Sequence, residues 1–186
     1  MTGIISLWLP ILLSAVLVFV ASSIIHMASP WHKNDYPPLP DENAFRNAVG
    51  PLDLSPGDYM VPRPKSREDL KSSEFLEKMR QGPKVIMTVL PKGDMGMGRN
   101  LAMWFVYLLV VSLFAAYVTG RALPPGTEYM KVFQLASTVT FIAHGVALWP
   151  MSIWYRRAWS TTIKSTIDGL IYGLLTAGMF GWLWPK

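Results

Sequence analysis

The sequence predicts an all-α membrane protein with four transmembrane helices and a small cytoplasmic α+β insert between the first and second helices. Of the 186 residues, 51% are hydrophobic and only 16% are charged. The apolar residues lie in blocks, as is typical of membrane proteins. Spanning a hydrocarbon core of about 30 Å takes roughly 20 helical residues. Four stretches without formal charge are long enough, at residues 1–32, 100–120, 132–155 and 169–185.

These stretches set the boundaries of the predicted elements. We predict transmembrane helices at 3–29, 100–120, 132–155 and 166–184, the insert at 30–99, an external loop at 121–131 and a cytoplasmic loop at 156–165. The first stretch has no Lys or Arg before its apolar run and no convincing cleavage site before Pro30. We therefore interpret it as a retained anchor and not as a signal peptide.

The basic residues predict the orientation in the membrane. Eleven Lys and Arg residues lie in the insert and three follow the third helix, whereas the opposite side has only Arg121, Lys131 and Lys186. Cytoplasmic loops carry an excess of Lys and Arg. We therefore expect a multi-pass membrane protein with both termini outside. The net charge of +5 then requires no nucleic-acid partner.

The insert shows local signals of helices and strands. "PDENAFRNAV" predicts a helix with Asp41 as its N-cap, and "SSEFLEKMRQG" predicts a second helix capped by Ser72 or Ser73. "GDYMVP" and "KVIMTVLP" predict short strands. A segment of about seventy residues buries too little apolar surface to fold stably without the membrane helices or a partner.

Small residues at helical spacing predict close helix packing. One stripe belongs to the fourth helix and a second belongs to the second helix. They consist of Gly169, Gly173, Ala177 and Gly181, and of Ser112, Ala116 and Gly120. Small side chains let another helix approach closely. We favour packing within the protein's own bundle, with docking on a partner protein as the alternative.

Two polar residues lie within or beside the apolar stretches. Ser165 and Asp168 match a capping box, so we interpret Asp168 as a helix cap, although an acid at the bilayer is a functional candidate. His144 is a candidate for axial cofactor binding, but a lone histidine favours an interhelical hydrogen bond. Pro150 is expected to kink the same helix.

The stretch "HMASPWHKNDYPPLPDE" is the main candidate for chemistry. If the chain folds back after Pro30, then His26, His32 and Asp35 or Asp41 converge, and imidazole with carboxylate suits zinc or iron. No metal-binding spacing is present, so we favour a simple exit from the membrane, with His32 at the headgroups. The absence of cysteine excludes disulfides, iron–sulfur clusters and thiolate zinc sites.

Several segments together resemble a bacterial family of uncharacterised integral membrane proteins. The residues that carry the resemblance are "SLWLPILLSAVLVFVASSIIHM", "PWHKNDYPPLPDE", "GDYM", "GRALPPG", "MSIWYRR" and "DGLIYGLLTAG" followed by "FGWLWP". The resemblance covers nearly the whole chain. It implies a bacterial membrane location but no activity, cofactor or site.

The favoured functional prediction is a non-catalytic accessory, assembly or stabilising subunit of a membrane complex. Charge within the membrane is almost absent and no nucleophile–base pair is visible. We expect no cofactor, and we expect membrane lipid, other subunits or further copies of the chain as partners. One alternative is a membrane enzyme or metal-dependent redox protein using His26, His32 and Asp35. The other is an oligomeric small-solute transporter using the region of His144 and Pro150.

Overall fold

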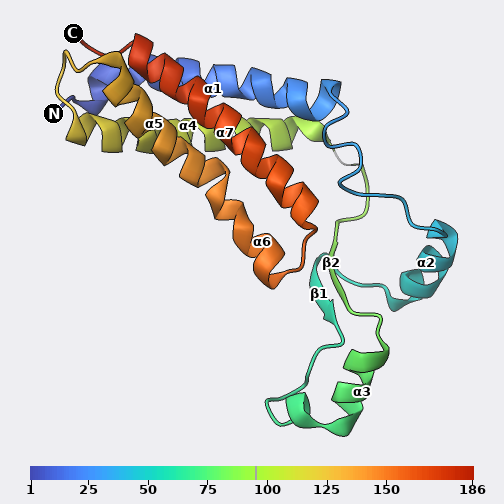
Figure 1. The fold of residues 1–186 in the computed structure, drawn as a ribbon. Helices are drawn as coiled ribbons and strands as arrows, with labels where there is room; N and C mark the ends of the chain where they lie inside the picture. Colours follow the sequence, from blue (N-terminus) through green and yellow to red (C-terminus); the bar gives the residue numbers. More distant parts are fainter. Residues whose placement is uncertain (95) are drawn as a thin grey trace. The chain divides into compact units, whose positions relative to one another are not determined.

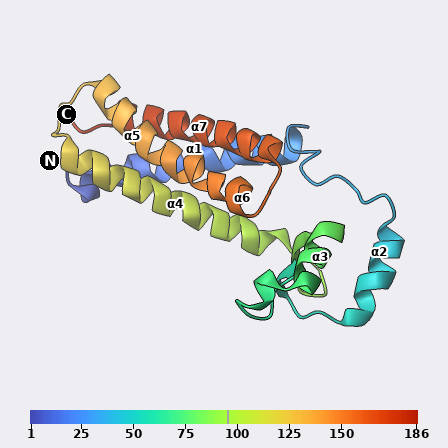
Figure 2. The same cartoon turned by 60° about the horizontal axis from the view of Figure 1, so that its bottom comes forward.

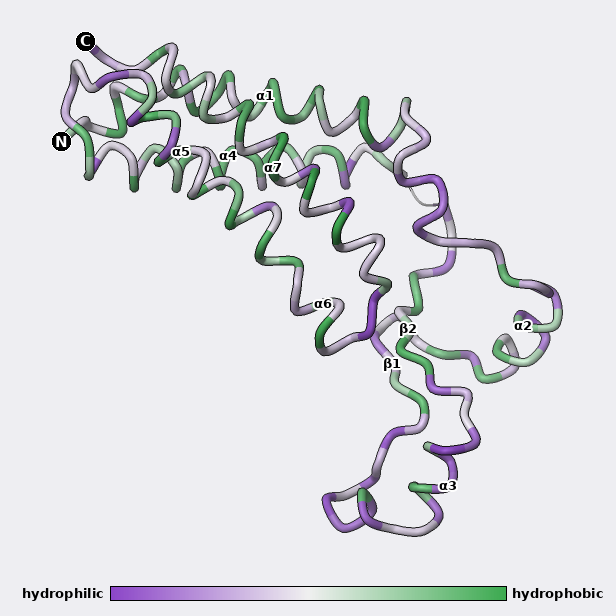
Figure 3. The backbone as a smooth tube through the Cα atoms, viewed as in Figure 1, coloured by the Kyte–Doolittle hydropathy of each residue, from purple (hydrophilic) through white to green (hydrophobic). Residues whose placement is uncertain are grey.

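The computed structural model describes residues 1–94 and 96–186 and is mostly helical (Figure 1). The chain forms two compact units. The helical unit comprises residues 1–37 and 96–186, and the insert unit comprises residues 38–95. Figure 3 shows hydrophobic residues along the helices of the first unit and many hydrophilic residues in the second.

Three segments of the helical unit are long and apolar enough to cross a membrane: Ile4–Ala28, Met97–Ala122 and Tyr129–Trp154. The first consists of η1 (Ile4–Leu7), α1 (Trp8–Ser23) and η2 (Ile24–Ala28), and the second is α4. The third consists of α5 (Tyr129–His144), η5 (Val146–Leu148) and α6 (Trp149–Trp154). These segments fit a multi-pass membrane protein. The final helix, α7 (Trp159–Trp182), is not among the three.

The helices of the helical unit pack side by side, with α7 against both α5 and α1 (Figure 2). One core cluster includes Leu7, Ala116 and Phe180, which are all fully buried. Both termini lie at one end of the unit (Figure 1). There the Thr2 N–H donates to the Gly120 carbonyl at 2.6 Å, and the Gly126 N–H donates to the Pro185 carbonyl at 2.8 Å.

The small residues of α7 face α5. A Cβ atom placed on Gly169 would lie 2.6 Å from the Gly145 nitrogen, and one on Gly173 would lie 3.2 Å from the Ser137 carbonyl oxygen. Such distances leave no room for a larger residue at Gly169. In the same stripe, Ala177 is fully buried and a Cβ on Gly181 would lie 2.6 Å from the Tyr129 ring.

The small residues of α4 contact the first segment. Ser112 accepts a hydrogen bond from Ser14 at 3.0 Å, and Ala116 is fully buried. A Cβ on Gly120 would lie 2.6 Å from the Thr2 carbonyl oxygen. Both stripes therefore make contacts within the chain itself.

The sequence predicted a kink at Pro150, but the third segment breaks at Gly145 instead. Helix α5 ends at His144, and the backbone at Gly145 lies close to Gly169 of α7, since a Cβ on Gly169 would be 2.6 Å from the Gly145 nitrogen. Pro150 lies in the first turn of α6. Proline has no backbone N–H, but an N–H in the first turn of a helix has no partner within the helix. Pro150 therefore removes no helical hydrogen bond.

The insert unit contains α2 (Glu42–Val49), β1 (Gly57–Val61), α3 (Ser73–Gln81) and β2 (Val85–Val89), with short 3₁₀ turns at Gly50–Leu52 and Asp69–Lys71. The strands pair antiparallel, with Gly57 opposite Val89 and Val61 opposite Val85. Asp41 and Ser72 cap the two helices, so the predicted α+β content is confirmed and Ser72 is the second cap. Phe75 is the only buried residue among the described positions 38–94.

Candidate functional site

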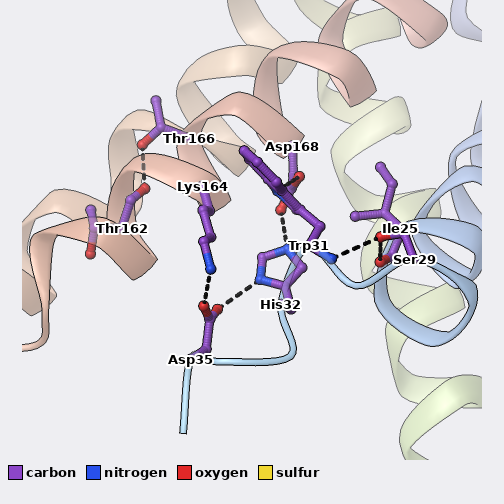
Figure 4. Close-up of polar contacts among 9 residues, drawn as sticks. All are labelled: Ile25, Ser29, Trp31, His32, Asp35, Thr162, Lys164, Thr166 and Asp168. Carbon is purple, nitrogen blue, oxygen red and sulfur yellow. Dashed lines mark hydrogen bonds and ion pairs between the residues drawn. The ribbon is translucent and has the colours of Figure 1, made fainter. Parts of the chain in front are cut away.

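The end of the first segment bends the chain back on itself. In η2, the Ser29 N–H donates to the Ile24 carbonyl at 3.0 Å, five residues back, which is the bond of a π-type turn. The Ser29 hydroxyl also donates to the Ile25 carbonyl at 2.6 Å (Figure 4). Turns of this kind are frequent at functional sites. The turn brings the His32 ring onto the His26 ring, stacked with their centroids 4.2 Å apart.

Asp168 of α7 lies against this turn, and the residue is only 3% exposed. Its Oδ2 atom is 2.7 Å from Nε2 of His32, and its Oδ1 accepts a hydrogen bond from the Trp31 indole at 3.1 Å (Figure 4). Both carboxylate oxygens therefore have a partner. The capping interpretation of Asp168 is wrong, because α7 begins at Trp159 and Asp168 lies well inside the helix.

Asp35 lies on the other side of the His32 ring. Its Oδ2 is 2.7 Å from Nδ1 of His32, and its Oδ1 accepts a hydrogen bond from Lys164 at 2.8 Å. Burial acts to raise the pKa of Asp35, but the hydrogen bonds from Lys164 and His32 outweigh it and hold the pKa below its usual range. These contacts complete a polar chain of Lys164, Asp35, His32, Asp168 and Trp31, which we call the buried polar chain because Asp35, His32 and Asp168 at its centre are largely buried. Trp31 and Lys164 at its ends are more exposed.

Three side chains of this cluster also form a candidate metal site. His26, His32 and Asp168 each offer one ligand atom, and these atoms lie within 4.8 Å of one another. Two imidazoles and one carboxylate form the ligand set of three-residue zinc sites and of non-haem iron sites. Ligands of this kind are normally oriented by further hydrogen bonds. Asp35 offers a hydrogen-bond acceptor to Nδ1 of His32, and the Trp31 indole donates a hydrogen bond to Asp168.

The structure confirms only part of the grouping of His26, His32 and Asp35 that was considered from the sequence. It brings His26 and His32 together, whereas Asp35 contacts the ring nitrogen of His32 that faces away from Asp168. The carboxylate of the candidate metal site is Asp168, which sequence reasoning had interpreted as a cap. His32 is partly buried between two carboxylates and does not lie as an exposed anchor.

A cavity of about 310 Å³ adjoins this cluster. His26 and Asp168 line it, together with four aromatic or imidazole rings from α4, α5 and α7: Trp104, Tyr107, His144 and Tyr172. We call this the aromatic cavity. Its lining combines an apolar surface with a few polar groups, which is typical of small-molecule sites.

The predicted interhelical hydrogen bond of His144 is not found among the described residues. Its ring instead packs at right angles to the rings of Tyr107 and Tyr172, with centroids 5.3 and 5.4 Å away. His144 is also outside the group of His26, His32 and Asp168. It therefore belongs to the wall of the aromatic cavity.

Comparison of the chain with protein-family models, with curated proteins and with solved structures gave no match. The resemblance to a bacterial membrane-protein family therefore stays a prediction.

Proposed function

We propose that the chain is a membrane protein that binds one divalent transition-metal ion through His26, His32 and Asp168. The observation that carries the proposal is the convergence of their three ligand atoms within 4.8 Å. The three residues come from the π-type turn, from the turn that follows it and from α7. Local sequence spacing does not create this set, because His32 and Asp168 are 136 residues apart.

The donor chemistry favours zinc or ferrous iron. Imidazole suits both ions, and a single carboxylate completes the set without the several oxygen ligands that calcium requires. His26, His32 and Asp168 would hold the ion in place of the direct contact between His32 and Asp168. When bound, it supplies a Lewis acid with coordination positions left for water or a small ligand. Asp168 and His26 also line the aromatic cavity, so a ligand there would lie beside the ion.

The test is the metal content of the full chain, purified with a tag that contains no histidine. We expect about one equivalent of zinc or iron and its loss in His26→Gln. His26 is exposed and has no hydrogen bond in the polar chain, so this change leaves those hydrogen bonds in place and removes only its ring stacking on His32. His144→Gln is the matched control, because it removes a histidine of the same bundle that lies outside the cluster, and it should keep the metal.

Two results would contradict the proposal. The first is a wild-type chain that holds no metal and binds neither added Zn²⁺ nor Fe²⁺. The second is equal metal content in the wild type and in His26→Gln. A metal-free chain that copurifies with a larger membrane complex would instead favour the accessory-subunit hypothesis.

We further propose that α7 is a fourth span, with the insert in the cytoplasm and both termini outside a bacterial inner membrane. Support comes from its 24 residues, which extend about 36 Å at 1.5 Å per residue. Support also comes from the bond between Gly126 and Pro185, which places its end beside the end of α4. The distribution of Lys and Arg supports the orientation.

The natural chain has no cysteine, so single cysteines can report this topology. An impermeant maleimide should label Lys186→Cys in intact cells and should label Ser66→Cys only after the cells are opened. Ser66 belongs to the insert unit. Labelling of both positions in intact cells, or of Ser66→Cys alone, would contradict the proposed topology.

A further inference from the structure

We propose that the aromatic cavity binds the head group of a membrane quinone, a flat ring that carries carbonyl oxygens. This inference goes beyond the metal site and does not depend on metal being bound. It rests on the size of the cavity, on the arrangement of its rings and on one buried hydroxyl group. The metal site and the quinone site would be neighbours, since His26 and Asp168 line the cavity.

The size and walls of the cavity suit a single flat ring. Its volume of about 310 Å³ is at the low end of the range for small-molecule sites, roughly 300–1,000 Å³. Trp104 and Tyr107 stack with centroids 5.2 Å apart, and the rings of His144 and Tyr172 are nearly perpendicular. Aromatic rings favour offset and edge-to-face contacts with another flat ring.

The Tyr172 hydroxyl is the hydrogen-bond donor of the proposed site. The side chain is 4% exposed, and its hydroxyl has no hydrogen-bond partner in the described part of the chain. A buried donor without a partner is energetically unfavourable. The Tyr107 hydroxyl, in the same wall, already donates to the Ala143 carbonyl at 3.2 Å. Tyr172 therefore has a hydroxyl that can donate to an acceptor oxygen of a ligand, such as a quinone carbonyl.

The charge and location of the cavity favour a neutral ligand from the lipid. No Lys or Arg is among the described residues that line it, so an anion would lack a counter-charge. Both oxygens of Asp168 already have partners within the chain, His32 and Trp31, so an organic cation would have to compete with them. Trp104 and His144 belong to segments that are long and apolar enough to cross a membrane. A quinone is neutral and lipid-soluble, and it accepts hydrogen bonds.

The test uses the full chain in detergent, with EDTA present so that the result does not depend on the metal site. The probe is 2,3-dimethoxy-5-methyl-1,4-benzoquinone, measured by isothermal titration calorimetry. Loss of one hydrogen bond should weaken binding about tenfold in Tyr172→Phe. Tyr107→Phe removes a hydroxyl from the same cavity that already has a partner, and its Kd should stay within about twofold of the wild type.

The proposal is overturned if the wild type does not bind the quinone, or if both Phe variants bind it like the wild type. Equal weakening in the two variants would also overturn it, because the hydroxyl of Tyr172 would then have no special part. p-Xylene is a ring of similar width without oxygens. If it bound as tightly as the quinone, the cavity would recognise shape alone and the proposal would be overturned. Ala143→Leu narrows the cavity from another wall and should also weaken binding. Size-exclusion profiles of all variants check that the bundle is intact.

Discussion

The helical unit and the insert unit use polar side chains in opposite ways. In the helical unit, hydrogen bonds join residues far apart in the sequence, such as His32 with Asp168, and both partners are largely buried. In the insert unit, the bonds are mostly local and exposed, such as Lys78 with Glu74. Local patterns in a sequence therefore describe the second unit well and the first unit poorly.

The difference also has an energetic meaning. An exposed ion pair contributes little to stability, because water solvates both charges well. A buried polar chain is costly to assemble, and removing one partner leaves the others without hydrogen bonds. Asp168 and its partners are therefore difficult to explain by stability alone. Their cost supports a role in binding, which is the basis of the proposed metal site.

Breaking the buried chain should have the largest effect. Asp168→Ala leaves the Trp31 indole and Nε2 of His32 without their partner. Removal of one member of a buried pair costs about 3–5 kcal/mol. For a chain of this size, that corresponds to a fall in apparent Tm on the order of 10 °C. Thermal unfolding in detergent with EDTA measures it, and an unchanged Tm would show that the buried chain contributes nothing to stability.

A close contact between α7 and α5 should give the next largest effect. Gly169→Ala places a Cβ 2.6 Å from the Gly145 nitrogen, so the helices must separate. Overpacking of this kind costs about 1–3 kcal/mol. Gly178→Ala is the matched control on the same helix, since its Cβ would lie 3.9 Å from the nearest atom, the Tyr129 hydroxyl oxygen. Equal Tm values for the two variants would contradict the close packing at Gly169.

The two units also show how far the sequence predicts this fold. Apolar stretches locate the three segments that can cross a membrane, because length and composition alone decide that property. In the insert, Asp41 and Ser72 are found from local patterns, since a cap bonds to the backbone three residues ahead. These features need no knowledge of the tertiary structure.

The candidate site could be predicted only in part. His26, His32 and Asp35 were recognisable as a group, because a fold-back after Pro30 brings them together. Asp168 was missed because the Ser165 pattern favours a cap, although an acid beside an apolar span was itself a signal. Lys164 precedes Asp168 by four residues and looks like its local partner. In the structure, each bonds instead to the turn after the first segment.

A change in the insert should have a smaller and local effect. Ser72→Ala removes the hydroxyl that accepts the Phe75 N–H at 3.1 Å. Loss of an N-cap costs about 1 kcal/mol. Hydrogen exchange of the amides in residues 73–81 should therefore be about five times faster. Ser73→Ala is the control, because Ser73 is the first helical residue and not the cap. Equal exchange in the two variants would contradict the assigned cap.

The smallest effect should come from the exposed pair of Glu74 and Lys78. The hydrogen bond and the charge of Lys78 hold the pKa of Glu74 below its ordinary value of 4.5. A lowered carboxylate pKa stabilises the fold above the ordinary pKa, and this contribution disappears as the pH falls through the folded-state pKa. Glu74→Gln should therefore leave Tm unchanged at pH 7, because the pair is exposed. It should also flatten the acid dependence of α3 exchange below pH 4.5. A marked loss of Tm at pH 7 would erase the contrast between the two units, since exposed and buried pairs would then be equally important.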